Sequence, residues 1–177
     1  HKLFIEQHLE MATKNKIINA TSLRLSNVYG PSLVSSSAND RGVLNKITET
    51  AINNKDITIY GDGNYTRDYV FIDDVVSAFI DCAISDNTIG RVFNVTSGVG
   101  YSIKEAFSLV SDSAAKLTSK KVKINHIEWP KGISMIERRN FIGNASELKR
   151  VTGWRSTTSF EDGVNIIVKE FWKKRSE

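Results

Sequence analysis

The sequence predicts an α/β fold. Segments with the two-residue alternation of strands and segments with the 3.6-residue spacing of helices follow one another along the 177 residues, with no internal repeat. Two segments, Ala20–Val28 and Val92–Thr96, are apolar on both faces near their centres, as buried parallel strands are. We therefore expect some parallel pairing, with these two segments in one sheet.

The elements of the first half are separated by Gly, Asn, Asp and Ser, which favour turns. In order, we predict a helix (Leu3–Thr13), the Ala20–Val28 strand, a Ser-rich loop interpreted as a mobile flap (Ser32–Arg41), a helix (apolar stripe Val43, Leu44, Ile47, Ala51) and two strands (Ile57–Tyr60, Asp68–Ile72). The next helix carries Val75, Val76, Phe79, Ile80 and Ala83. We expect Asp73 or Asp74 to cap its N-terminus and not to bind a metal.

The second half continues the alternation. After Val92–Thr96, the pattern Ser102-Ile103-Lys104-Glu105 is a capping box and predicts a helix start. The remaining predicted elements are a strand (Lys121–Ile127), an irregular segment (Trp129–Asn140), a short helix (Ser146–Val151), a turn (Gly153-Trp154) and a closing helix (Phe160, Val164, Ile167, Val168, Phe171).

Composition excludes several classes of protein. A content of 40% hydrophobic and 25% charged residues is typical of a globular domain. The net charge is +4 and the basic runs are short, which favours solvated ends over a nucleic-acid surface. The single cysteine, Cys82, permits no disulfide within the chain and fits a reducing, cytoplasmic compartment. No apolar run reaches the ~18 residues that span a membrane, and His8 and His126 have no metal-ligand spacing, so we expect no metal.

Four motifs, in order, carry a family resemblance. They are LRLSNVYGP (Leu23–Pro31), ITIYGDGNYTRDYVFIDDV (Ile57–Val75), VFNVTSGVGYSIKE (Val92–Glu105) and NASELKRVTGW (Asn144–Trp154). Together they resemble the C-terminal half of the extended short-chain dehydrogenases/reductases, specifically the NAD-dependent nucleotide-sugar epimerase/dehydratase family. The resemblance implies the C-terminal part of a Rossmann-type protein with a small α/β substrate-binding lobe. Residues 1–177 would hold that lobe and the last strands and helices of the NAD-binding lobe.

The same resemblance implies that the nucleotide-binding half is missing. No Gly residue here has the spacing of a dinucleotide-binding turn. The segment HKLFIEQHLE resembles the family helix that starts at the Lys of the Tyr-x-x-x-Lys pair, so Lys2 would be that Lys and the Tyr would precede His1. Lys2 would hydrogen-bond the ribose next to the nicotinamide of NAD and favour the phenolate form of the Tyr. The alternative is an exposed terminal lysine.

Arg67 is the residue expected to meet the diphosphate of a nucleotide sugar. A planar guanidinium matches two phosphate oxygens better than an ammonium does. The resemblance places the backbone of Thr58, Ile59 and Tyr60 against the nucleotide base. The alternative is an Arg at a strand end that pairs with Asp68 or Asp62.

The resemblance assigns further contacts. Asn27 would bind the sugar diphosphate, and the Ser26 backbone would lie against the nicotinamide carboxamide. The helix start Gly42-Val43-Leu44 would lie along the substrate, where free N–H groups favour an anion. Glu137 stands where the family has the Asp of Arg-x-x-Asp and would accept ribose hydroxyls. The Arg of that motif falls on Ser134, so Lys131, Arg138 or Arg139 is the candidate replacement for its charge.

Several functions remain open from the sequence. The leading hypothesis is the substrate-binding portion of an epimerase acting at the sugar C4 through a transient 4-keto intermediate. A 4,6-dehydratase, a decarboxylase and a 4-keto reductase are alternatives within the family. A nucleotide-binding relative without turnover and a scaffold that associates through the Leu3–Thr13 helix are alternatives outside it. Apolar Phe4, Leu9 and Met11 predict a homodimer of the intact protein, with no nucleic-acid and no membrane partner.

Overall fold

The computed structural model describes residues 1–31 and 42–176, so the predicted Ser32–Arg41 loop lies outside the described residues. The helices are α1 (Lys2–Lys14), α2 (Val43–Ile52), α3 (Ile72–Ala83), η1 (Asp86–Thr88), α4 (Ile103–Thr118), η2 (Met135–Arg138), α5 (Ser146–Thr152) and α6 (Phe160–Ser176), where η marks a 3-10 helix. The strands are β1 (Ser22–Leu25), β2 (Asn27–Tyr29), β3 (Ile57–Tyr60), β4 (Thr66–Phe71), β5 (Val92–Val95), β6 (Gly100–Ser102) and β7 (Ile124–Ile127).

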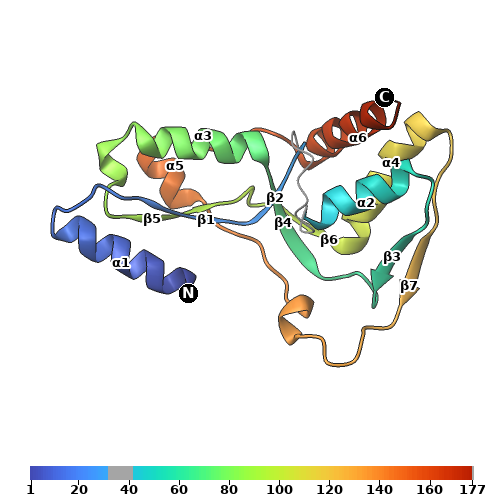
Figure 1. The fold of residues 1–177 in the computed structure, drawn as a ribbon, viewed down its shortest axis with the longest axis horizontal. Coiled ribbons are helices and arrows are strands. Elements are labelled where there is room, and N and C mark those ends of the chain that lie inside the picture. Colours follow the sequence, from blue (N-terminus) through green and yellow to red (C-terminus); the bar gives the residue numbers. More distant parts are fainter. Residues whose placement is uncertain (32–41, 177) are drawn as a thin grey trace.

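The strands form small sheets, most of them parallel. β1 pairs with β5, and β3 pairs with β7, both in parallel. β4 is central in the sheet β2-β4-β6, parallel to β2 and antiparallel to β6. In Figure 1, β1 and β5 lie between α1 on one side and α3 with α5 on the other, whereas α2, α4, α6, β3 and β7 gather at the opposite end. The sheet β2-β4-β6 joins the two parts.

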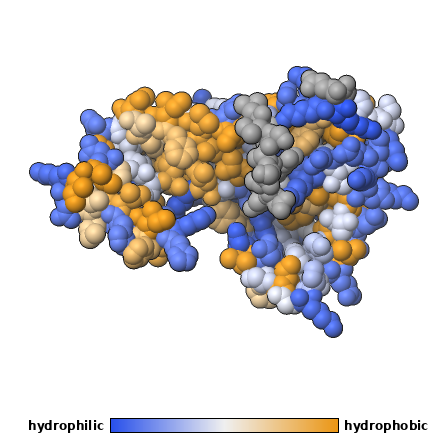
Figure 2. Space-filling view, in the orientation of Figure 1, coloured by the Kyte–Doolittle hydropathy of each residue, from blue (hydrophilic) through white to orange (hydrophobic). Residues whose placement is uncertain are grey.

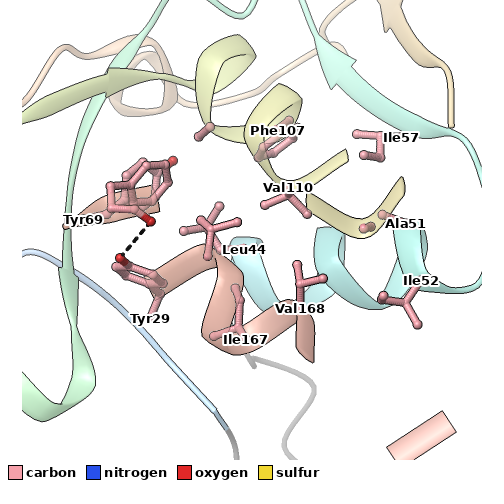
Figure 3. Close-up of a cluster of buried hydrophobic side chains, with 14 of the residues drawn as sticks. Tyr29, Leu44, Ala51, Ile52, Ile57, Tyr69, Phe107, Val110, Ile167 and Val168 are labelled. Carbon is pink, nitrogen blue, oxygen red and sulfur yellow. Dashed lines mark hydrogen bonds between the residues drawn. The ribbon is translucent and has the colours of Figure 1, made fainter. Parts of the chain in front are cut away.

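Each part has its own hydrophobic core. The larger core packs α2, α4 and α6 together and includes Leu44, Val110 and Ile167, which are almost fully buried (Figure 3). The dashed line in Figure 3 marks the hydrogen bond from the Tyr29 hydroxyl to the Phe160 carbonyl, 3.4 Å long. The second core, with Phe93 and Leu148 at its centre, lies between the β1-β5 sheet, α3 and α5. Burial of one such side chain contributes about 1.5–3 kcal/mol, so both clusters stabilise the fold.

The expected pairing of Ala20–Val28 with Val92–Thr96 is confirmed for its first part only. Ser22–Leu25 pairs with Val92–Val95, but the chain changes partner at Ser26. From Asn27 onward it pairs with β4 instead. The predicted single strand is therefore two strands in two sheets, which is the point where the two parts of the molecule meet.

The expected cap of α3 was wrong. The N-cap is Phe71 and makes no side-chain cap, because β4 runs directly into the helix and leaves Asp73 and Asp74 in its first turn. Asp74 instead accepts hydrogen bonds from the amides of Thr157 and Thr158, both 3.1 Å long, and fixes the chain before α6. The capping box of α4 is confirmed, with both reciprocal bonds between Ser102 and Glu105 present. Strand β6, which lies between β5 and α4, was not predicted from the sequence.

One surface of the molecule is conspicuously apolar. Figure 2 shows hydrophobic residues gathered over α3. Val76, Phe79 and Ile80 there are about half exposed, on the face of α3 opposite the second core. Among the described residues, no helix is both long and apolar enough to cross a membrane.

Candidate functional site

The main candidate site is a pocket of about 810 Å³ between α2, β3, β4 and the long segment that follows β7. It brings together most of the residues proposed from sequence for substrate binding. Those that line it are Asn27, Val43, Thr58, Ile59, Tyr60, Arg67 and Glu137. These residues come from five separate segments of the chain, so the fold gathers what the sequence only suggested.

One wall of this pocket belongs to the segment 129–143, which we call the strap. The strap residues that line the pocket are Trp129, Ile133, Ser134, Glu137 and Arg139. In Figure 1 the strap is the orange segment that contains η2 and returns toward β4. At its start, Trp129 stacks on Tyr60 with ring centroids 5.5 Å apart, and Tyr65 meets Trp129 edge-on at 6.1 Å. The Arg138 guanidinium also lies against this cluster, 5.6 Å from the Trp129 ring. The start of the strap is thus held by aromatic contacts.

Gly61 makes the close approach of Trp129 possible. Its φ of +70° is a conformation that favours glycine, and a Cβ there would lie 2.5 Å from Trp129 Nε1. A turn at Asp62-Gly63-Asn64 follows, closed by the bond from the Asn64 amide to Asp62 Oδ1 at 3.1 Å. A side chain at position 61 would therefore displace the indole from the pocket wall.

Arg67 holds the middle of the strap. Its side chain is 9% exposed, and its Nη2 donates to the Glu137 carbonyl at 2.6 Å. Its Nη1 donates to the carbonyls of Arg139 and of Thr66, the latter at 3.1 Å. Among the described residues, Arg67 forms no ion pair with Asp68 or Asp62, so that sequence alternative does not describe it. The guanidinium thus uses donors on the strap while it lines the pocket.

Asn27 and Ser26 lie beside Asp68 at the junction of the two parts. Asn27 Nδ2 donates to the Asp68 carbonyl at 2.8 Å, and Ser26 Oγ donates to Asp68 Oδ1 at 3.1 Å. The Ser26 amide donates to the Val95 carbonyl at 3.0 Å, which ends the pairing with β5. Asn27 reaches the pocket, whereas Ser26 does not line it.

The start of α2 adjoins a smaller cavity of about 230 Å³. Gly42 is the N-cap with φ +71° and forms no side-chain cap. The Val43 side chain lines both cavities. The Leu44 side chain is 2% exposed and belongs to the hydrophobic core, so only its backbone is available to a ligand.

Lys2 lies at the end of α1 that points toward the carboxyl ends of β1 and β5. The Glu6 carboxylate pairs with Arg24, with Nη2 and Oε2 2.6 Å apart. Thr13, near the opposite end of α1, lies beside Gly90, just before β5 begins. The helix therefore runs antiparallel to the two strands, and Lys2 and Ser26 lie toward the same sheet end, where α/β sheets bind their ligands.

The charges of the lining favour an anion. Its ionised side chains are the cations Lys46, Arg67 and Arg139 and a single carboxylate, Glu137. Burial raises the pKa of Tyr69 to about 12, so this lining hydroxyl remains protonated at neutral pH. Within residues 1–31 and 42–176, no cluster of His, Cys, Asp or Glu could hold a metal ion.

Sequence reasoning missed some of this lining. Lys46 and Tyr65 were not proposed, and Arg139 was one of three alternatives; Ser134, the position that lacks the family's Arg, also lines the pocket. Lys46 follows Gly42 by one helical turn, which is a spacing that could have indicated it. No local pattern indicates the stacking of Trp129, because its partner Tyr60 lies in a distant segment.

Known proteins share the sequence pattern of this chain. The model for the NAD dependent epimerase/dehydratase family matches residues 1–96. UDP-glucose 4-epimerase of Mycolicibacterium smegmatis is 27% identical over 172 residues, which cover 97% of this chain and 51% of that protein. UDP-N-acetyl-alpha-D-glucosaminuronate decarboxylase of Bacillus cytotoxicus is 28% identical over 158 residues, which cover 85% and 46%.

A solved structure of a family relative has a similar fold. The crystal structure of UDP-glucose 4-epimerase with UDP-glucose from Thermotoga maritima is 30% identical and has a TM-score of 0.82, covering 97% of this chain and 52% of that one. The chain therefore has the α/β fold of these Rossmann-type proteins over nearly its whole length. It spans about half the length of the curated relatives it matches.

Proposed function

Because the chain belongs to the NAD dependent epimerase/dehydratase family, we propose that it is the nucleotide-sugar-binding portion of an enzyme that acts at the sugar C4. The observation that carries the proposal is the pocket, which has aromatic rings on one wall and cations on another. A nucleoside diphosphate sugar presents the matching chemistry, a flat base and a dianionic linker. In the proposal, residues 1–177 hold the substrate lobe and the last strands and helices of the cofactor lobe, and the complete enzyme contains a further nucleotide-binding half.

The base is proposed to lie along β3. There the backbone of Thr58, Ile59 and Tyr60 can hydrogen-bond the edge of the base, while Trp129 and Tyr60 provide aromatic surface. Base–aromatic stacking contributes about 1–3 kcal/mol for each base. Since every base has an aromatic face, this wall supports binding of a nucleotide without selecting one base.

The diphosphate is proposed to lie near Arg67. A guanidinium has five N–H donors, and Arg67 uses three of them on the carbonyls of Thr66, Glu137 and Arg139. The remaining two donors can meet phosphate oxygens. Lys46 and Arg139 add positive charge in the same lining, and Arg139 supplies the charge that Ser134 lacks. Asn27, the start of α2 at Gly42 and the Glu137 carboxylate are proposed to complete the contacts to phosphate, sugar and ribose.

The residues at the carboxyl end of the β1-β5 sheet fit the nicotinamide riboside end of NAD. Lys2 is exposed there and can donate to ribose hydroxyls, and the backbone at Ser26 is the proposed neighbour of the carboxamide. NAD, when bound, supplies the hydride acceptor needed to oxidise the sugar C4 hydroxyl to a ketone. The ammonium of Lys2 would also favour the deprotonated form of a nearby Tyr hydroxyl by electrostatic attraction.

Family membership leaves the reaction type open. The matched relatives include a decarboxylase as well as an epimerase, so a decarboxylase, a 4,6-dehydratase or a 4-keto reductase is the second candidate. A nucleotide-binding relative without turnover is the third. We also propose that the complete protein is a homodimer, because Leu3, Phe4 and Met11 on α1 are more than half exposed. A monomer in light scattering at micromolar concentration would contradict the dimer.

Calorimetric titration of this chain with UDP, uridine and NAD tests the proposal. We expect UDP to bind more tightly than uridine, because only UDP presents a diphosphate to Arg67 and its neighbouring cations. Equal affinities would remove the diphosphate from this pocket. We expect no measurable binding of NAD, and micromolar affinity for NAD would refute the proposed division of the cofactor site between this chain and a further half.

A further inference from the structure

Asp68 is a fully buried carboxylate that hydroxyl and amide groups surround. Its side chain is 0% exposed. Oδ1 accepts hydrogen bonds from Ser26 Oγ at 3.1 Å, the Ser97 amide at 3.0 Å and Ser97 Oγ at 2.9 Å. Oδ2 accepts from the Gly98 amide at 3.0 Å, the Gly143 amide at 3.1 Å and Thr96 Oγ1. No Lys or Arg in the described part of the chain pairs with it, so these neutral donors alone compensate its buried charge.

The donors come from three segments that are remote in sequence. Ser26 lies where the chain passes from β1 to β2, Thr96 to Gly98 form the turn after β5, and Gly143 ends the strap. The approach at Gly143 is tight, since a Cβ there would lie 2.5 Å from Thr96 Oγ1. One carboxylate therefore fixes the cofactor side of the proposed site, through Ser26, and the end of the pocket wall at once.

Thr66 and Arg67, the neighbours of Asp68 in β4, also form hydrogen bonds with the strap. The Thr66 amide donates to Asn140 Oδ1 at 2.8 Å, and the Phe141 amide donates to the Thr66 carbonyl at 3.0 Å. Arg67 binds the carbonyls of Glu137 and Arg139. Of these anchors on β4, Asp68 alone also bonds to both the β1–β2 junction and the turn after β5.

We propose that Asp68 is a positioning residue that preforms the nucleotide site without touching the ligand. It holds the strap and the Ser26–Asn27 junction in one fixed arrangement, so that the pocket exists before the ligand arrives. Its replacement by Asn keeps the shape but removes the charge and turns an NH₂ group toward hydroxyl and amide donors. The end of the strap should then open locally, and a ligand would have to order it on binding.

Asp74 provides a matched control. It is also buried, 4% exposed, and accepts hydrogen bonds from the backbone amides and side chains of the segment 156–158. Asp74 does not line the pocket that contains Arg67. Asp74→Asn therefore makes the same chemical change in a similar environment, but all four hydrogen bonds to the Asp74 carboxylate come from residues 156–158 and none from the strap. If Asp68 serves stability alone, the two substitutions should have the same effect on the nucleotide site.

The experiment measures two properties of Asp68→Asn and Asp74→Asn. The first is hydrogen exchange at the amides of Phe141 and Gly143, which we expect to become about 10-fold faster in Asp68→Asn and to change less than about 2-fold in Asp74→Asn. The second is the affinity for UDP. We expect the dissociation constant to rise about 10-fold in Asp68→Asn and to change less than about 2-fold in Asp74→Asn. Equal exchange rates in the two variants, or unchanged exchange in Asp68→Asn, would overturn the proposal. Where the unsubstituted chain binds UDP, equal losses of UDP affinity in the two variants would overturn it as well.

A milder pair keeps the test decisive if Asp68→Asn does not fold. Ser97→Ala removes one side-chain bond to Asp68, and Ser156→Ala removes one side-chain bond to Asp74. Only Ser97→Ala should speed exchange at Gly143, and equal exchange in the two variants would count against the proposal. The affinity measurement rests on the proposed function, whereas the exchange measurement does not. Absence of UDP binding by the unsubstituted chain would therefore refute the proposed function and leave the positioning role to the exchange result.

Discussion

Replacement of Arg67 by Met separates the two roles of this side chain. Met has a similar length and removes all N–H donors, so the bonds to the carbonyls of Glu137 and Arg139 are lost. Both strap residues are exposed, and water can replace the guanidinium at their carbonyls. The loss of stability should therefore lie near the lower end for bonds to a charged group, about 1.5 kcal/mol for each bond or about 3 kcal/mol together.

The same substitution should weaken nucleotide binding. Loss of a charge-assisted contact to a phosphate costs about 2–4 kcal/mol, which corresponds to about 30- to 900-fold in the dissociation constant for UDP. Urea unfolding measures the first effect, and calorimetric titration with UDP and uridine measures the second. Arg150→Met is the control, because it removes the same charge from α5, outside the pocket lining. Unchanged stability would refute the role of Arg67 in holding the strap, and unchanged UDP affinity would refute its contact with the diphosphate.

Three further predictions follow from other contacts. Trp129→Ala should weaken UDP and uridine equally, by about 1–3 kcal/mol, because it removes base stacking and no charge; titration that shows loss for UDP alone would place the base elsewhere. Burial raises the pKa of Asp74, but the bonds from Thr157, Ser156 and Thr158 outweigh it and hold the pKa below its ordinary 3.8. Its charged form therefore stabilises the fold above pH 3.8, and this contribution is lost as the pH falls through the lowered pKa. Urea unfolding between about pH 6 and pH 3 should thus show a flatter decline for Asp74→Asn, which is already less stable at neutral pH by about 2 kcal/mol. Ser102→Ala removes the cap of α4 and should cost about 1 kcal/mol in thermal unfolding. Ser108→Ala, in the interior of the same helix, should cause no such loss because Ala is the best helix former, and equal losses in the two variants would contradict the capping role.

Local patterns predicted the helices and most strands. The capping box of Ser102 and Glu105 is satisfied within one helical turn, and the apolar runs of β1 and β5 pair as their composition suggests. The break at Ser26 was not predictable from such patterns. Ser26 bonds there to Asp68, which lies 42 residues away, and nothing in the alternation of Ala20–Val28 marks the change of partner.

Sequence reasoning about the site had a similar limit. The motif around Thr58–Tyr60 and Arg67 identified residues that the fold gathers in one pocket. The network of Asp68 was missed, although an acidic residue inside a strand that is buried from Arg67 to Phe71 was an available signal. The capping expectation for Asp74 failed for the converse reason. The local rule was sound, but a direct passage from β4 into α3 and the hydroxyls of residues 156–158 gave the carboxylate another set of partners.

The open side of β1 has a consequence for the behaviour of the chain in concentrated solution. Within the described residues, β1 has β5 as its sole strand partner. The backbone groups of Ser22–Leu25 that face the other way can accept any extended segment, because such pairing depends on N–H and C=O groups and not on side chains. Self-association through this edge should therefore increase steeply with protein concentration, persist at high salt and be reversed by low concentrations of urea.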